Sequence, residues 1–152
     1  MQSFHPYTLR CLREAGWFSG RNVDPRPFLS RAGVADLGAD TVIARFFAEF
    51  GGLIVKYVRR RSPVRPSPLD VFRFDPRYAP NMEADDYSAY LSKEVVPIGD
   101  AFRYHANLMM DMSGYVYGSV DSEVFLVGER STAAIDNLCL DREMPKIADI
   151  RR

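Results

Sequence analysis

Apolar residues recur with the spacing of an α-helix most clearly over residues 39–50, ADTVIARFFAEF. The apolar positions are separated by steps of one, three and four, so they form one broad stripe along a helix. They are Val42, Ile43, Phe46, Phe47 and Phe50. Two glycines follow at 51–52 and are expected to end the helix, because glycine accepts the left-handed conformation of a C-cap.

Other helices are predicted from apolar spacing and from residues that start or stop helices. They span residues 6–15, 28–32 and 83–94, and from 131 or 132 to about 140. In the helix at 83–94, Tyr87, Tyr90 and Leu91 are expected to point inward. The hydroxyl of Ser131 or Thr132 is expected to cap the last helix, because it can accept a hydrogen bond from the first backbone N–H groups.

Short runs rich in β-branched and aromatic residues predict strands. These runs span residues 53–58, 69–74, 106–112, 115–120 and 123–128. The connection at 59–68 holds three prolines and four arginines, and we expect an exposed hairpin connection because proline lacks the N–H of a strand ladder. The last residues, DREMPKIADIRR, are expected to be a loose, charged tail.

This order of elements predicts an α+β fold, with a mostly antiparallel (mixed) sheet flanked by helices. The 152 residues fit one domain, placed at residues 1–140, with a charged C-terminal tail at 141–152. No secretion signal is recognised, so Cys11 and Cys139 are expected to be reduced and the compartment to be the cytoplasm. A disulfide between the two cysteines stays open as the alternative.

The charges balance over the whole chain but not along it. There are 20 Lys and Arg against 20 Asp and Glu. Residues 1–76 hold twelve basic and seven acidic residues, a net +5, and residues 77–152 hold eight basic and thirteen acidic residues, a net −5. The zero total argues against a surface built throughout to bind nucleic acid or anionic membrane. If the fold separates the two halves, the protein is an electric dipole.

The sequence shows no recognisable catalytic, cofactor-binding or metal-binding motif. His5 and His105 lack the spacing of a zinc site, and the glycines do not form a phosphate-binding loop. The arginines at 59–65 lack interleaved aromatic residues and are expected to lie on a solvated loop. An alternative class, a metal-assisted hydrolase, would use His105 and Asp111 together with the acidic cluster at residues 83–86 and 121–123.

Acidic residues of the second half are the candidate partner-binding residues. They are Glu83, Asp85, Asp86, Asp121 and Glu123. Complementary charge speeds association and sets specificity, so a basic protein surface is the partner they would fit. The simpler interpretation is a solvated helix start, where carboxylates stabilise the positive end of the helix dipole.

A set of segments, in order, resembles the SUKH superfamily and specifically its third subgroup. The segments are LREAGWFSGRNVD (12–24), FFAEFGGLIV (46–55), FRFDP (72–76), VPIGDAF (96–102), MDMSGYVYG (110–118) and FLVGERSTAAIDNLC (125–139). Each segment is short, and together they span residues from about 9 to 140.

The resemblance implies a single α+β module and a function as an immunity protein of a bacterial polymorphic toxin system. Such a protein binds and blocks a toxin domain, often a nuclease or a nucleic-acid deaminase, and is not itself an enzyme. The implied partner is therefore a cognate toxin domain, with no direct nucleic acid, membrane or cofactor, and a monomer is favoured. A regulatory scaffold that binds other proteins is the alternative that the same resemblance leaves open.

Overall fold

The strands of the sheet follow one another in space in the same order as along the chain. The computed structural model describes residues 3–80 and 82–150. Within these residues, one antiparallel sheet has the order β1-β2-β3-β4-β5-β6-β7. The strands are β1 (Ile54–Val58), β2 (Leu69–Arg73), β3 (Val95–Ala101), β4 (Ala106–Asp111), β5 (Val116–Val120), β6 (Glu123–Gly128) and β7 (Lys146–Asp149). The predicted α+β class is confirmed.

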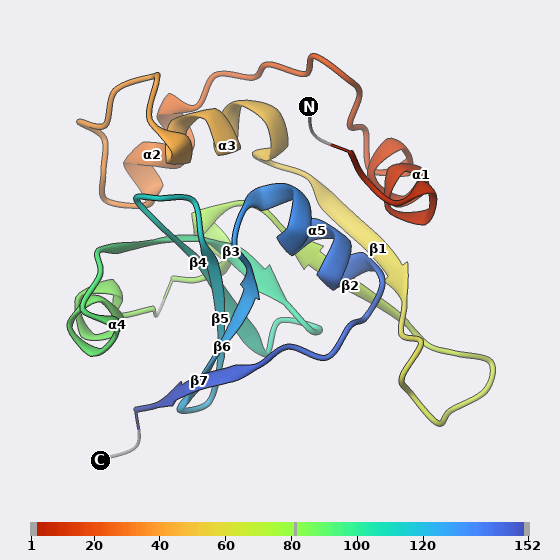
Figure 1. Ribbon diagram of the computed structural model, residues 1–152. Helices are drawn as coiled ribbons and strands as arrows, with labels where there is room; N and C mark the ends of the chain where they lie inside the picture. Colours follow the sequence, from red (N-terminus) through yellow and green to blue (C-terminus); the bar gives the residue numbers. More distant parts are fainter. Residues whose placement is uncertain (1–2, 81, 151–152) are drawn as a thin grey trace.

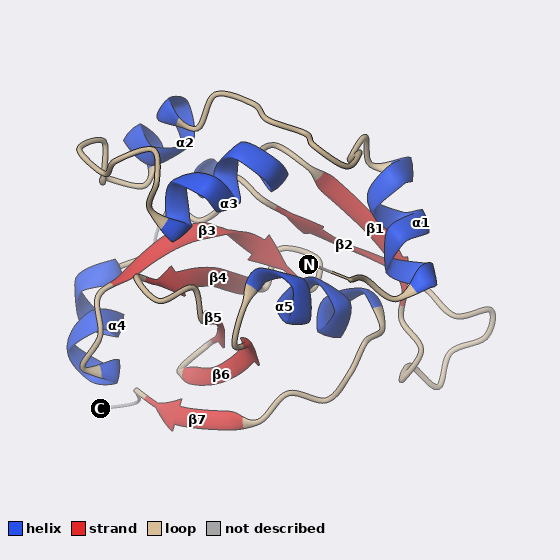
Figure 2. Ribbon diagram, turned by 45° about the horizontal axis from the view of Figure 1, so that its top comes forward, coloured by secondary structure: helices blue, strands red, loops and turns tan. Residues whose placement is uncertain are grey.

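Helices lie on both sides of this sheet (Figures 1 and 2). They are α1 (Pro6–Glu14), α2 (Arg26–Arg31), α3 (Val42–Phe50), α4 (Ala84–Leu91) and α5 (Ser131–Cys139), with a 3-10 helix η1 at Pro76–Tyr78. α1, α3 and α5 cover one face, which we call the helical face. α4 packs on the opposite face, the α4 face. Among the described helices, none has the length and apolar character needed to cross a bilayer.

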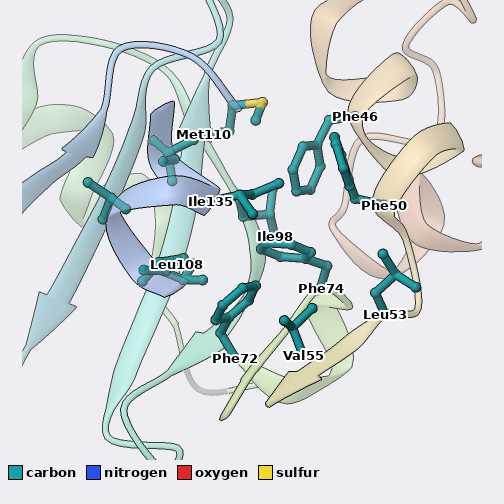
Figure 3. Packing of buried hydrophobic residues seen from close by; sticks show 14 of the residues in the cluster. Phe46, Phe50, Leu53, Val55, Phe72, Phe74, Ile98, Leu108, Met110 and Ile135 are labelled. Atoms are coloured by element: carbon teal, nitrogen blue, oxygen red, sulfur yellow. The ribbon is translucent and has the colours of Figure 1, made fainter. Parts of the chain in front are cut away.

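The main core lies between the helical face and its helices (Figure 3). Phenylalanines of α3 pack against Phe74, which directly follows β2. Phe46 and Phe74 make an edge-to-face contact with 5.0 Å between their ring centroids. Phe47 and Phe72 are fully buried. Each such side chain contributes about 2 kcal/mol by leaving water. The apolar stripe predicted for α3 is therefore the centre of the core.

Helix ends agree with the sequence in part. α3 starts at Val42 rather than 39, because Thr41 is the N-cap and its hydroxyl accepts a hydrogen bond from Ala44 N–H at 3.2 Å. The predicted cap of α5 is wrong: Arg130 holds the N-cap position in extended backbone and makes no side-chain cap, so Ser131 already lies in the helix. α4 ends before 94, because Ser92 turns the chain in a left-handed conformation.

Two strands were not predicted. β3 has the sequence VVPIGDA, and its proline and glycine hide the strand pattern. The register shifts between Pro97 and Gly99, which is where a sheet tolerates proline. The expectation of a loose tail is wrong for Lys146–Asp149, which pairs with β6 as β7. Ala148 and Ile150 pack into the smaller cluster on the α4 face, so burial offsets the polar character of this segment.

The backbone pairing within the sheet is shortest between β2 and β3. Among the described residues, Arg73 and Asp100 are the one pair in register between these strands. A Cβ on Gly99 would lie 1.8 Å from the carbonyl oxygen of Arg73, so only glycine allows this approach of the two backbones. Because the strands are in sequential order, the junction also separates β1 and β2 of the basic half from β3 to β7 of the acidic half.

Candidate partner-binding surface

Glu83, Asp85 and Asp86 lie together at the start of α4. Asp85 and Asp86 belong to the first turn, and Glu83 occupies the N-cap position without a side-chain cap. All three side chains are exposed. Their charges stand at the positive end of the helix dipole, so the fold gains stability from them while they still face solvent.

Asp121 and Glu123 lie at the turn between β5 and β6. Both are exposed, and Asp121 adopts a positive φ of 54°. Lys146 of β7 lies with its Nζ 3.4 Å from Glu123 Oε1 and 3.4 Å from Asp149 Oδ2. Hydrogen bonds to these two carboxylates raise the pKa of Lys146. Lys146 thus partly balances the charge of Glu123, and it does so from β7, a strand that the sequence did not predict.

The structure places the five acidic residues in two groups rather than one cluster. The hydroxyl of Tyr90, near the end of α4, donates to the carbonyl oxygen of Asp149, which lies opposite Glu123 in the sheet. The β5–β6 turn therefore lies beside the C-terminal end of α4. Glu83, Asp85 and Asp86 lie at the N-terminal end of this helix, which is eight residues or about 12 Å long. The expectation that Tyr90 points inward is wrong, because Tyr87 and Leu91 share the packed side of α4 and Tyr90 is 52 % exposed between the two groups.

Asp111 is buried, and its carboxylate is bound by neighbouring groups of the same domain. Its carboxylate accepts hydrogen bonds from Ser113 N–H at 2.8 Å, Tyr115 N–H at 3.1 Å and the Tyr117 hydroxyl at 2.8 Å. Lys93 Nζ lies 3.8 Å from the same carboxylate. Burial, and then the hydrogen bond to Asp111, raise the pKa of Tyr117. Asp111 thus shapes the predicted hairpin turn between β4 and β5.

The residues of the hydrolase alternative are not brought together. His105 directly precedes β4 and Asp111 is its last residue, so a strand length of about 20 Å separates them. Among residues 3–80 and 82–150, no group of three or more His, Cys, Asp or Glu side chains is placed to hold a metal ion.

Arginines of the 59–68 connection bind their own domain. Arg59 Nε lies 3.7 Å from Asp70, and the backbone N–H of Arg61 donates to Asp141 at 2.8 Å. The guanidinium of Arg60 lies over the ring of Tyr7, at 4.6 Å from its centroid. The connection is exposed as predicted, and these contacts fix it to the rest of the protein.

The sequence did not predict a stacked arginine at the β2–β3 junction. Arg73 donates to both carboxylate oxygens of the buried Asp100, at 2.9 and 2.6 Å. Its guanidinium carbon lies 3.6 Å from the ring centroid of Tyr78 and 4.0 Å from that of Tyr104. The hydrogen bonds to Asp100 raise the pKa of Arg73. One signal was visible: Arg73 continues the alternation of Leu69 and Val71, which places it on the α4 face.

A cleft of about 330 Å³ opens between α3, the β4–β5 turn and the start of α5. Arg45, Glu49 and Arg130 are among its polar lining residues. Glu49 accepts a hydrogen bond from the indole N–H of Trp17 at 3.2 Å, and Trp17 packs at the edge of the core. Burial raises the pKa of Glu49, and the Trp17 hydrogen bond opposes this.

Cys11 of α1 and Cys139 of α5 are both free and buried. They meet across the helical face, where a hydrogen bond between the thiols lowers the pKa of Cys11 and raises that of Cys139. Both cysteines are free thiols in the structure, as expected from the sequence.

The fold is thus a single α+β domain that exposes acidic side chains at the start of α4 and at the β5–β6 turn. The family model described as SUKH-3 immunity protein matches residues 4–141. The chain belongs to this family, which confirms the resemblance of its sequence segments. The curated proteins gave no match. The solved structures gave none either.

Proposed function

We propose that this protein is an immunity protein that binds a toxin domain directly and neutralises it by that contact. The observation that carries the proposal is membership of the SUKH-3 immunity family over residues 4–141. A nuclease or nucleic-acid deaminase of a bacterial polymorphic toxin system is the proposed target. The proposed site of action is the cytoplasm, where a monomer meets the toxin before the toxin reaches its substrate.

The acidic side chains on and beside α4 are the proposed contact for a basic toxin surface. Glu83, Asp85 and Asp86 are exposed at the start of α4, and Asp121 and Glu123 lie beside its other end. Toxins that act on nucleic acid carry positive charge where they hold phosphates, so an acidic surface complements them. Tyr90, exposed between the two groups, adds an aromatic side chain of the kind enriched in binding hot spots.

Co-expression tests this function. The toxin domain encoded beside the gene is induced in cells with and without this protein, and survival is counted. Survival that depends on this protein, with recovery of a complex of the two chains, is the expected result. Cell death at the same rate with and without the protein would rule the proposal out and favour the scaffold alternative.

A further inference from the structure

One part of the α4 face is left open. α4 and its cluster cover β3 to β7 but do not reach β1 and β2 (Figure 2). There α1 borders Ile54 and Lys56, with which it lines a hollow, and Tyr78 of η1 lies over Arg73. Ile54 and Leu69 are 43 % and 56 % exposed there, and Val58 and Val71 are half-buried beside them. The pairs Val58 with Leu69 and Lys56 with Val71 place these side chains next to one another. We call Ile54, Lys56, Val58, Leu69, Val71 and Tyr104 the open face.

The exposed charges that border the open face are mainly positive, and one exposed carboxylate, Glu14 of α1, lines a hollow together with Ile54 and Lys56. Lys56 is exposed in the middle of β1, between Ile54 and Val58. Asp70 is buried, accepts the backbone N–H of Arg103 at 2.8 Å and lies beside Arg59. Asp100 is buried and bound by Arg73. Asp70 and Asp100 are therefore already paired, and an incoming group meets Lys56, with Glu14 beside it, and Arg103, while Arg59 is shared with Asp70.

Tyr104 is held in place at the border of the open face. Phe102, Arg103 and Tyr104 have positive φ values of 52°, 52° and 74°, a conformation that costs L-residues about 1–2 kcal/mol each. Asp70 offsets this cost by accepting the Arg103 N–H, and the Arg103 guanidinium donates to the carbonyl oxygen of Leu69. Stacking on Arg73 fixes the ring of Tyr104, which is nevertheless 63 % exposed. A strained turn thus presents a rigid aromatic ring to solvent, a combination found at binding sites.

We propose that the open face docks a segment of the toxin domain that presents carboxylates around an apolar centre. This inference rests on the proposed function and names the chemistry of a second contact. The aliphatic side chains of β1 and β2 match an apolar protein surface, and the cations around them match acidic residues at its rim. Nucleic acid is the poorer occupant, since Tyr104 is the single ring of the open face and its aliphatic side chains give further bases nothing to stack on. The open face and α4 lie on the same side of the sheet, so one toxin domain can contact both.

Binding of the toxin domain encoded beside the gene, measured by surface plasmon resonance, tests the docking. The variants Lys56→Glu, Leu69→Glu and Tyr104→Ala are compared with the wild-type protein. Matched controls are Phe18→Glu, at an exposed aromatic residue after α1, and Arg142→Glu, at an exposed cation after α5. Leu69→Glu and Lys56→Glu change exposed side chains, so they test the surface even if Tyr104→Ala loosens the turn. Circular dichroism confirms that each variant is folded.

The open-face variants are expected to bind about tenfold or more weakly, with the controls unchanged. Lys56→Glu is expected to act mainly on the association rate, because a rim charge steers the encounter. Wild-type affinity in Lys56→Glu and Leu69→Glu would overturn the docking proposal alone. No binding by the wild-type protein would overturn the proposed function with it. Binding of a labelled poly(dT) oligonucleotide that the same variants lose, with toxin binding intact, would assign the surface to nucleic acid instead.

Discussion

The guanidinium of Arg73 and the carboxylate of Asp100 form a two-pronged ion pair across the β2–β3 junction, at 2.9 and 2.6 Å. The two residues are also the pair in register that joins these strands in the described sheet. Side chains therefore reinforce the sheet where its backbone pairing is thinnest. The same contact holds Arg73 between Tyr78 and Tyr104, and so couples the stability of the sheet to the shape of the open face.

Replacing Arg73 by methionine should lower the free energy of unfolding by about 3 kcal/mol, because it leaves the buried Asp100 carboxylate without its partner. The double variant Arg73→Met/Asp100→Leu should recover much of the loss, since no buried charge then remains. Urea denaturation measures both. Arg26→Met, which breaks an exposed pair with Asp24, is the matched control and should leave the unfolding free energy nearly unchanged. Equal stability of Arg73→Met and wild type would contradict the role given to the pair.

Gly99→Ala should destabilise the protein strongly. The added methyl group would lie 1.8 Å from the carbonyl oxygen of Arg73, so β2 and β3 must separate to admit it. Gly38→Ala is the control, because a Cβ there meets only the side chain of Asp40. Thermal unfolding should show a large fall in melting temperature for Gly99→Ala and a small change for Gly38→Ala. A fall of the same size in both variants would mean that the close approach of β2 and β3 at Gly99 does not determine the stability of the protein.

The variant Glu49→Gln should change how stability depends on pH. Because burial raises the pKa of Glu49 in the folded protein, folding favours its protonated form. This preference adds to the free energy of unfolding below the ordinary glutamate pKa of about 4.3. The contribution is lost as the pH rises through the raised pKa of Glu49 in the folded protein. The unfolding free energy of wild type minus that of Glu49→Gln should therefore fall as the pH rises above about 4. Urea denaturation followed by Trp17 fluorescence measures it, and a difference independent of pH would refute the assignment.

Reversing the charge of Asp86 should slow toxin binding. Asp86→Lys places a cation in the exposed first turn of α4, and a basic partner would then be repelled during encounter. The association rate should fall about tenfold at low salt and less at high salt, because salt screens exposed charges. Asp36→Lys, at an exposed acid between α2 and α3, is the control. An unchanged association rate for Asp86→Lys would remove α4 from the contact.

The helices and most strands could be predicted because their apolar residues repeat with regular periods. α3 and β2 are examples, and their boundaries shifted by up to three residues. β3 could not be predicted because its Pro97 sits at a register shift that exists only once β4 pairs with it. β7 could not be predicted because it is rich in charged residues, and Lys146 meets Glu123 only after the chain returns to β6.

Within the sheet, the strands of the basic and the acidic half of the chain lie apart because the strand order is sequential. The open face could not be predicted, because its residues come from segments that are far apart in the sequence. Asp100 lies 27 residues after Arg73, and Asp70 meets Arg103 across 33 residues. A pattern within β2 alone reveals an arginine on one side of a strand. It does not reveal the carboxylate and two rings that hold that arginine.

The direct test of the central claim is a titration of toxin activity. The toxin domain encoded beside the gene is purified, and its activity is measured while this protein is added in increasing molar ratio. Loss of activity that is complete near an equimolar ratio, with a stable complex on gel filtration, is the predicted result. Full toxin activity at a large excess of the protein, with the two chains eluting separately, would contradict an immunity function by direct binding.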